Sequence, residues 1–165
     1  MPAYVIAPWS NFFLVEAAAA ATLSGLVIVA ISINIARILA SPQLPGRAGE
    51  SLVKLMGVLL LASLALVPEQ PIRWYGIEAL AVGLPMWGLP FRLQIHSLLR
   101  HRDQPRQWIL PRFALSQMAT LPILVAGVSL LVERGGGLYW LVPGVLFSLI
   151  AAVHNTWVLL VEILR

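Results

Sequence analysis

Residues 12–39 read FFLVEAAAAATLSGLVIVAISINIARIL, with no charged side chain between Glu16 and Arg37. A membrane-spanning helix needs about 20 apolar residues, because each residue advances the helix by about 1.5 Å through a hydrocarbon core about 30 Å thick. No Lys or Arg precedes this stretch, and it is longer than the apolar core of a cleaved signal peptide. We therefore expect a retained membrane-spanning helix over residues 12–39.

The composition extends this expectation to the whole chain. Of 165 residues, 59% are apolar and only 11% are charged, which is far from the composition of a soluble domain. There is no cysteine, so disulfides, thiolate metal sites and cysteine nucleophiles are excluded. The sequence predicts an integral membrane protein.

Four further apolar segments follow the first. The third of the five contains Pro85 and Pro90, which we expect to kink it and to free backbone carbonyls. The fold class predicted is an all-α integral membrane protein of five transmembrane helices, in a single domain over residues 1–165. The remaining spans are expected at about residues 50–67, 75–99, 113–132 and 138–164.

The distribution of basic residues predicts the orientation, because loops rich in Lys and Arg stay in the cytoplasm. Five spans place Arg73 and Arg134 on one side of the membrane and the other nine basic residues on the opposite side. The amino terminus is therefore expected outside and the carboxyl terminus in the cytoplasm. The loop between the third and fourth spans is expected to lie on the cytoplasmic headgroups. Its predicted headgroup contacts are Arg100, Arg102, Arg106, Trp108 and Arg112.

The first predicted helix carries two stripes at helical spacing. One stripe consists of small residues, which allow helices to approach closely in lipid. We expect it to be the helix-packing face and the first helix to lie at the centre of the bundle. This stripe contains Ala18, Thr22, Gly25, Ser32 and Ala36. The other stripe runs from Glu16 to Arg37 and places the amide of Asn34 at membrane depth.

Three polar residues are expected inside the membrane, at Asn34, His154 and Asn155. For Asn34 the favoured interpretation is an interhelical hydrogen bond, and the alternative is a pore-lining role. His154 is expected to bond to Asn34 or Ser32, while haem ligation together with His96 is the alternative. We expect neither a cofactor nor a metal ion.

Glu78 is the fourth candidate intramembrane polar group. The favoured interpretation is an interfacial carboxylate paired with Arg73 or Arg134, and the alternative is a proton or cation site beside the interrupted third helix. A break at Pro85 and Pro90 could line a cavity, although a packing kink is the commoner outcome.

Two cations lie close to the ends of short apolar runs. Lys54 and Arg92 are expected to extend their side chains toward the cytoplasmic headgroups rather than to be buried. Lys54 also follows Glu50 by four residues, and Arg47 precedes Glu50 by three, so a row of ion pairs along one helix is predicted.

Motifs typical of enzymes do not occur in the sequence. There is no H-E-x-x-H, no G-x-S-x-G, no G-x-x-x-x-G-K and no G-x-G-x-x-G, and Asp103 is the only aspartate. The sequence therefore predicts a protein that is not an enzyme.

Several segments together resemble a group of small uncharacterised bacterial inner-membrane proteins, some of them labelled modulators of the membrane-anchored AAA protease. These segments are residues 12–39, LPGRAGESLVKLMGVLLLASLALVPEQ, GIEALAVGLP and the ending NTWVLLVEILR. The positions that carry the resemblance are Asn34, Arg47, Glu50, Pro68, Gln70, Glu78 and Glu162. The resemblance implies a bacterial inner membrane and supplies no catalytic residue.

The leading functional hypothesis is an accessory or modulator subunit that associates through its helices with itself or with another membrane complex. No nucleic-acid partner is expected. A small oligomeric ion or proton channel lined by Glu78, Asn34 and the third helix is the alternative. A haem subunit using His96 and His154 is the third hypothesis.

Overall fold

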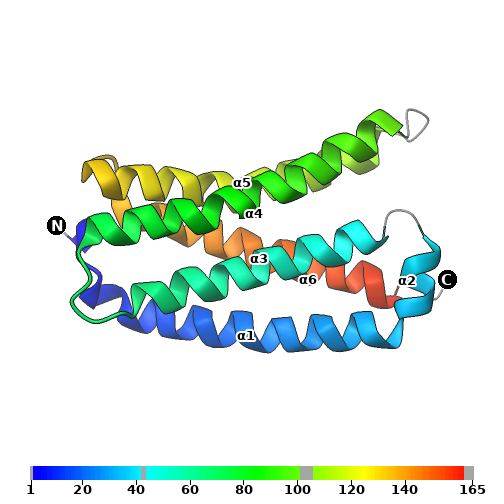
Figure 1. Cartoon of the computed structure of the whole chain (residues 1–165), viewed down its shortest axis with the longest axis horizontal. Helices are drawn as coiled ribbons and strands as arrows, with labels where there is room; N and C mark the ends of the chain where they lie inside the picture. Colours follow the sequence, from blue (N-terminus) through cyan, green and yellow to red (C-terminus); the bar gives the residue numbers. More distant parts are fainter. Residues whose placement is uncertain (1, 42–43, 101–105, 162–165) are drawn as a thin grey trace.

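The computed structural model describes residues 2–41, 44–100 and 106–161, and within these ranges the chain forms helices and turns without a strand. Figure 1 shows an elongated bundle of five long helices and one short one. The α-helices are α1 (Ser10–Ile33), α2 (Ile35–Ala40), α3 (Leu44–Ala65), α4 (Ile72–Arg100), α5 (Arg106–Val132) and α6 (Leu141–Val161). Three 3₁₀ turns are η1 (Pro2–Tyr4), η2 (Ala7–Trp9) and η3 (Gly137–Trp140). The predicted all-α fold is confirmed.

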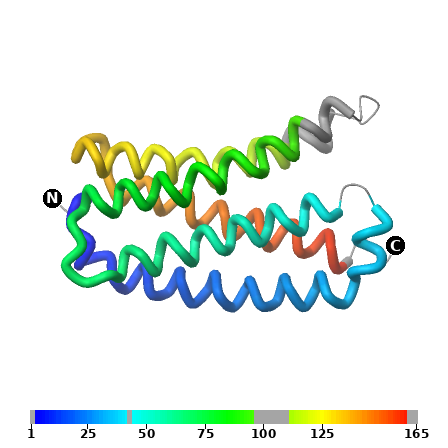
Figure 2. The backbone as a smooth tube through the Cα atoms, in the orientation of Figure 1, coloured from blue at the N-terminus to red at the C-terminus, as the bar shows by residue number. Residues whose placement is uncertain are grey.

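Consecutive long helices run in opposite directions, so that the chain reverses at the two ends of the bundle (Figure 2). The start of α1, the α3–α4 turn and the α5–α6 turn lie at one end, which we call the outer end. The ends of α1 and α6 and the start of α3 lie at the other, which we call the inner end. Short connections of this kind favour antiparallel neighbours.

Among the described residues, four helical segments are long and apolar enough to cross a membrane, as expected of a multi-pass membrane protein. These segments are Ala7–Ile33, Leu44–Ala65, Pro111–Val132 and Gly137–Leu160. They correspond to four of the five predicted spans. The helix α4 has 29 residues but is less apolar, since it contains Glu78, Arg92 and Gln94. Its crossing of the membrane stays a prediction.

The centre of the bundle is α3, which packs against α1, α4 and α6. The sequence predicts α1 at the centre, and this prediction is wrong. Only 28% of the apolar window of α1 is buried, compared with 56% for α3. The helix α1 lies at the edge of the bundle in Figure 1, where it contacts α3 and, less extensively, α6.

The helix α4 runs without interruption through Pro85 and Pro90. A break of this helix was the basis for a wet cavity beside Glu78, and the continuous helix removes that basis. A proline inside a helix removes one hydrogen bond and disturbs the preceding turn, but the neighbouring turns can continue. The predicted kink itself stays a prediction.

Two glycines allow the backbones of α4 and α5 to approach closely. A Cβ atom added to Gly76 would lie 3.1 Å from the backbone oxygen of Gly127, and one added to Gly127 would lie 3.2 Å from the oxygen of Gly76. Small residues permit this contact between backbones. The two helices then run side by side, with Trp87 Nε1 donating to Gln117 Oε1 at 2.9 Å.

Close packing of side chains and a glycine turn organise the outer end. Phe13, Tyr75 and Leu138 are buried together there, and the Tyr75 hydroxyl donates to the Leu61 carbonyl at 3.1 Å. The turn at residues 135–137 consists of three glycines with φ angles of 88°, 113° and 55°. Such left-handed angles favour glycine because it has no Cβ atom.

Candidate functional site

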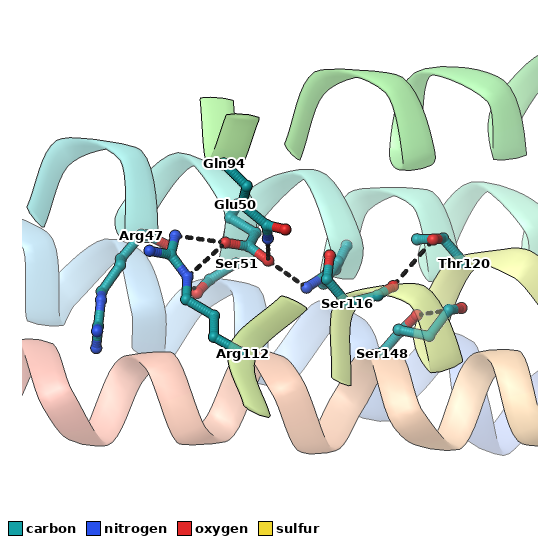
Figure 3. Close-up of polar contacts among 10 residues, drawn as sticks. Arg47, Glu50, Ser51, Gln94, Arg112, Ser116, Thr120 and Ser148 are labelled. Atoms are coloured by element: carbon teal, nitrogen blue, oxygen red, sulfur yellow. Dashed lines mark hydrogen bonds and ion pairs between the residues drawn. The ribbon is translucent and has the colours of Figure 1, made fainter. Parts of the chain in front are cut away.

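The most polar part of the interior is the carboxylate of Glu50, which is only 2% exposed. Its Oε1 atom accepts hydrogen bonds from Lys54 Nζ at 2.6 Å and from Gln94 Nε2 at 3.0 Å. Its Oε2 atom accepts from Arg112 Nη2 at 2.6 Å and from Arg112 Nε at 3.2 Å. Figure 3 shows Gln94 and Arg112 converging on this carboxylate. We call Glu50, Lys54, Gln94 and Arg112 the Glu50 cluster.

Three helices supply the Glu50 cluster from a common depth. Glu50 and Lys54 are one turn apart on α3, where residues i and i+4 share a face. Gln94 comes from α4 and Arg112 from α5. Glu50, Gln94 and Arg112 each lie about six residues, or roughly 9 Å, from the inner end of their helix. The cluster therefore forms a layer across the inner end of the bundle.

Four accepted hydrogen bonds use the full capacity of a carboxylate. Glu50 therefore has no lone pair left with which to act as a free base. The cluster is also unbalanced, since one carboxylate faces two cations. Lys54 is 1% exposed and Arg112 is 24% exposed, so water screens the charge of Lys54 less than that of Arg112. Removing one partner from a buried ion pair is strongly destabilising, because the other charge stays uncompensated.

The cluster corrects one prediction and confirms another. Lys54 does not extend to the headgroups but is buried, because Glu50 on its own helix compensates its charge. The guanidinium of Arg112 bonds to Glu50 and is 24% exposed, and its contact with the headgroups stays a prediction. The predicted pairing of Glu50 with Lys54 is confirmed. Arg92, in contrast, is exposed.

Most of the predicted headgroup loop cannot be compared. Arg102 lies outside the described residues, as does Glu162 at the end of the chain. Arg100, Arg106 and Trp108 lie in the helices α4 and α5, but their side chains are outside the described part of the structure.

Glu78 lies near the outer end and is half-buried. Its Oε2 atom accepts a hydrogen bond from Gln70 Nε2 at 2.6 Å, so its partner is an amide rather than the predicted Arg73 or Arg134. Arg73 instead bonds to Glu133 at 2.7 Å on the surface. Gln70 lies two residues before α4 begins and eight residues before Glu78, so this contact is local in the chain.

Asn34, His154 and Asn155 do not form one site. The Asn34 side chain is buried and donates to the Ala30 carbonyl of its own helix at 3.3 Å, rather than across to another helix. Asn34 is where α1 ends and α2 begins, so the amide satisfies a terminal carbonyl. Asn155 is buried, whereas His154 is exposed on α6.

The small-residue stripe of the first helix points away from the bundle. Its members Ala18, Thr22, Gly25, Ser32 and Ala36 are all exposed. The opposite row, which includes Ala20, Val27 and Ala30, is buried and meets α3 and α6 instead. The sequence favoured the small residues as the packing face, whereas the row that is buried also contains Glu16 and Asn34. The stripe therefore does not pack within this chain.

The haem hypothesis rests on His96 and His154. The His96 side chain lies outside the described part of the structure, and His154 is exposed at the surface of α6. Within the described residues, no group of three or more His, Cys, Asp or Glu side chains is placed to hold a metal ion.

Sequence reasoning missed Gln94 and the central place of Glu50. The signal for Glu50 was present, since an acidic and a basic residue four apart interrupt an otherwise apolar segment. Gln94 and Arg112 gave no such signal, because their contacts join residues 44 and 62 positions away in the chain.

The fold and the cluster define a class of protein: a multi-helix bundle of membrane-protein composition with an ionic layer across one end. Comparison of the chain with known protein families, curated proteins and solved structures finds no match.

The substitution Glu50→Gln should destabilise the bundle by about 3–5 kcal/mol, because it leaves Lys54 and Arg112 without a counter-charge. For a chain of this size, this corresponds to a fall in the unfolding midpoint on the order of 10 °C. The measurement is thermal unfolding of the purified protein in a mild detergent.

The matched control is Glu133→Gln, which removes the same charge from the exposed pair with Arg73. It should cost at most about 1 kcal/mol. Equal shifts for the two variants would show that the Glu50 cluster contributes no more than a surface pair.

Proposed function

We propose that the chain is a non-enzymatic accessory or modulator subunit of a bacterial inner-membrane complex, related to the small membrane proteins that its segments resemble. The observation that carries the proposal is the uncovered face of α1. The exposed positions Ala18, Thr22 and Gly25 follow one another at helical spacing, and an added Cβ atom on Gly25 would meet nothing within 4 Å. A helix of a partner could approach this face closely.

Five spans fit this proposal better than four. Contacts between α4 and α5 continue along both helices, from Gly76 and Gly127 near the outer end to Phe91 and Phe113 near the inner end. A helix that lies alongside a membrane-spanning helix over this length has the same depth available to it. The Glu50 cluster also gives polar Gln94 a partner inside the bundle. The basic residues then favour an outer amino terminus and a cytoplasmic carboxyl terminus.

An enzymatic role receives no support from the arrangement of the cluster. A general base needs a free lone pair within reach of its substrate, but the oxygens of Glu50 are already occupied by four hydrogen bonds. A fixed ionic layer of this kind fits a structural scaffold.

No specific observation supports the alternative of an ion or proton channel either. Asn34 ends α1, whereas Glu78 lies in the second turn of α4, so the two residues belong to opposite ends of the bundle. Both are engaged in hydrogen bonds within the chain. We therefore retain the accessory subunit as the single proposed function.

The substitution Gly25→Leu should release the partner without unfolding the chain, because the added side chain occupies the uncovered face of α1. Native mass spectrometry of the protein extracted from its own membranes should find a heteromeric assembly for the wild type and the chain alone for the variant. Gly88→Leu on α4 is the matched control, since its added Cβ atom also meets nothing within 4 Å. A wild type extracted without a partner, or an assembly retained by Gly25→Leu, would contradict the proposal.

Single cysteines can test the five spans, because the natural chain contains none. We expect a membrane-impermeant maleimide to label Glu69→Cys and Arg134→Cys in intact spheroplasts, and Pro45→Cys only after the membrane is opened. The wild-type chain is the control for background labelling. Labelling of positions 69 and 134 from opposite sides would mean that α4 does not cross the membrane.

A further inference from the structure

A pocket of about 220 Å³ lies beside the Glu50 cluster, between α3, α5 and α6. Glu50, Lys54 and Arg112 form its polar wall, and Asn155 of α6 also lines it. Leu115 and Ala151 contribute apolar surface. The pocket therefore combines buried charge with an apolar lining, as a site for an amphiphilic molecule would require.

The charges on the polar wall do not cancel. Lys54 and Arg112 supply two positive charges, and Glu50 supplies one negative charge. His154 also lines the pocket and can offer a ring N–H as a hydrogen-bond donor. Carrying an excess positive charge in a poorly hydrated site is costly, and an anion in the pocket would balance it.

The two cations also hold more hydrogen-bond donors than Glu50 can accept. A lysine ammonium has three donors, and Lys54 directs one of them to Glu50. An arginine has five donors, and Arg112 directs its Nε and one Nη2 donor to the same carboxylate. Because the oxygens of Glu50 are filled, the remaining donors fit further anionic oxygens. Phosphate oxygens suit arginine and lysine donors well.

The pocket opens on the side of the bundle that α5 and α6 form. Pro111, Ile150 and His154 line it and are exposed, so it can be entered from between α5 and α6. Arg112 lies about six residues, or roughly 9 Å, from the inner end of α5. At this depth a ligand could place a charged group on the cluster and keep its hydrocarbon chains against the apolar surface of the bundle.

We propose that this pocket binds the phosphate group of an anionic phospholipid from the cytoplasmic leaflet. The phosphate oxygens accept hydrogen bonds from Lys54, Arg112 and His154, while the acyl chains lie along the surface of α5 and α6. The assignment to the cytoplasmic leaflet rests on the orientation given under the proposed function. The site itself is independent of the partner assigned to α1.

The test adds phosphatidylglycerol, diacylglycerol or inorganic phosphate to the delipidated full-length protein and counts bound molecules by native mass spectrometry. We expect a phosphatidylglycerol adduct, no diacylglycerol adduct, and no displacement of the lipid by equimolar inorganic phosphate. Binding of inorganic phosphate as tightly as the lipid would overturn the lipid assignment. Equal binding of diacylglycerol would show that the phosphate is not recognised.

Two substitutions locate the lipid at the pocket. Arg112→Gln removes the excess charge while keeping Glu50 paired with Lys54, and it should weaken the Kd for phosphatidylglycerol by about tenfold or more. His154→Gln is at an exposed position and should weaken the Kd without lowering the unfolding midpoint, so it decides the test if Arg112→Gln fails to fold.

The matched control is Arg92→Gln, which removes the same charge from an exposed site on α4 and should leave the Kd unchanged. Equal affinities for His154→Gln, Arg92→Gln and the wild type would overturn the proposal. Because none of these variants changes the exposed face of α1, partner release by Gly25→Leu is a separate outcome.

Discussion

The four hydrogen bonds accepted by Glu50 are the constraint on which the arrangement of the helices depends. Apolar contacts between helices give little driving force in lipid, because the lipid tails are as apolar as the side chains. A buried carboxylate with three partner side chains is different, since each displaced partner leaves an unpaired polar group. The cluster therefore fixes the depth and rotation of α3, α4 and α5 relative to one another.

The two ends of the bundle are held by different interactions. At the inner end, charge holds the helices together through Glu50, Lys54 and Arg112. At the outer end, close packing does so, through the contact of Gly76 with Gly127 and the burial of Tyr75. The less apolar helix α4 takes part in both. This explains how a helix containing Glu78, Arg92 and Gln94 can belong to a bundle of membrane-protein composition. The helix α1 takes no part in the cluster, and its small-residue stripe is exposed.

The features that could be predicted from the sequence are local ones. Hydropathy placed four apolar helices because each depends on its own residues, and the spacing of Glu50 and Lys54 indicated their pair within one helix. The predictions that failed concern which face of a helix is buried and which residues pair between helices. The buried row of α1 was not identified, since the residues that cover Ala20 and Val27 come from other helices. The ion pair of Arg112 with Glu50 was missed for the same reason, because its partner lies 62 residues earlier.

The most direct test of the role of the Glu50 cluster is a double-mutant cycle between Glu50 and Arg112. It compares E50Q, R112Q and the double variant with the wild type. The unfolding free energies should be strongly non-additive, with a coupling above about 1 kcal/mol, because the second substitution costs less once the first has removed its partner. Such coupling would show that the two charges hold α3 and α5 together. Additive effects within about 0.5 kcal/mol would contradict the account, since independent sites behave in that way.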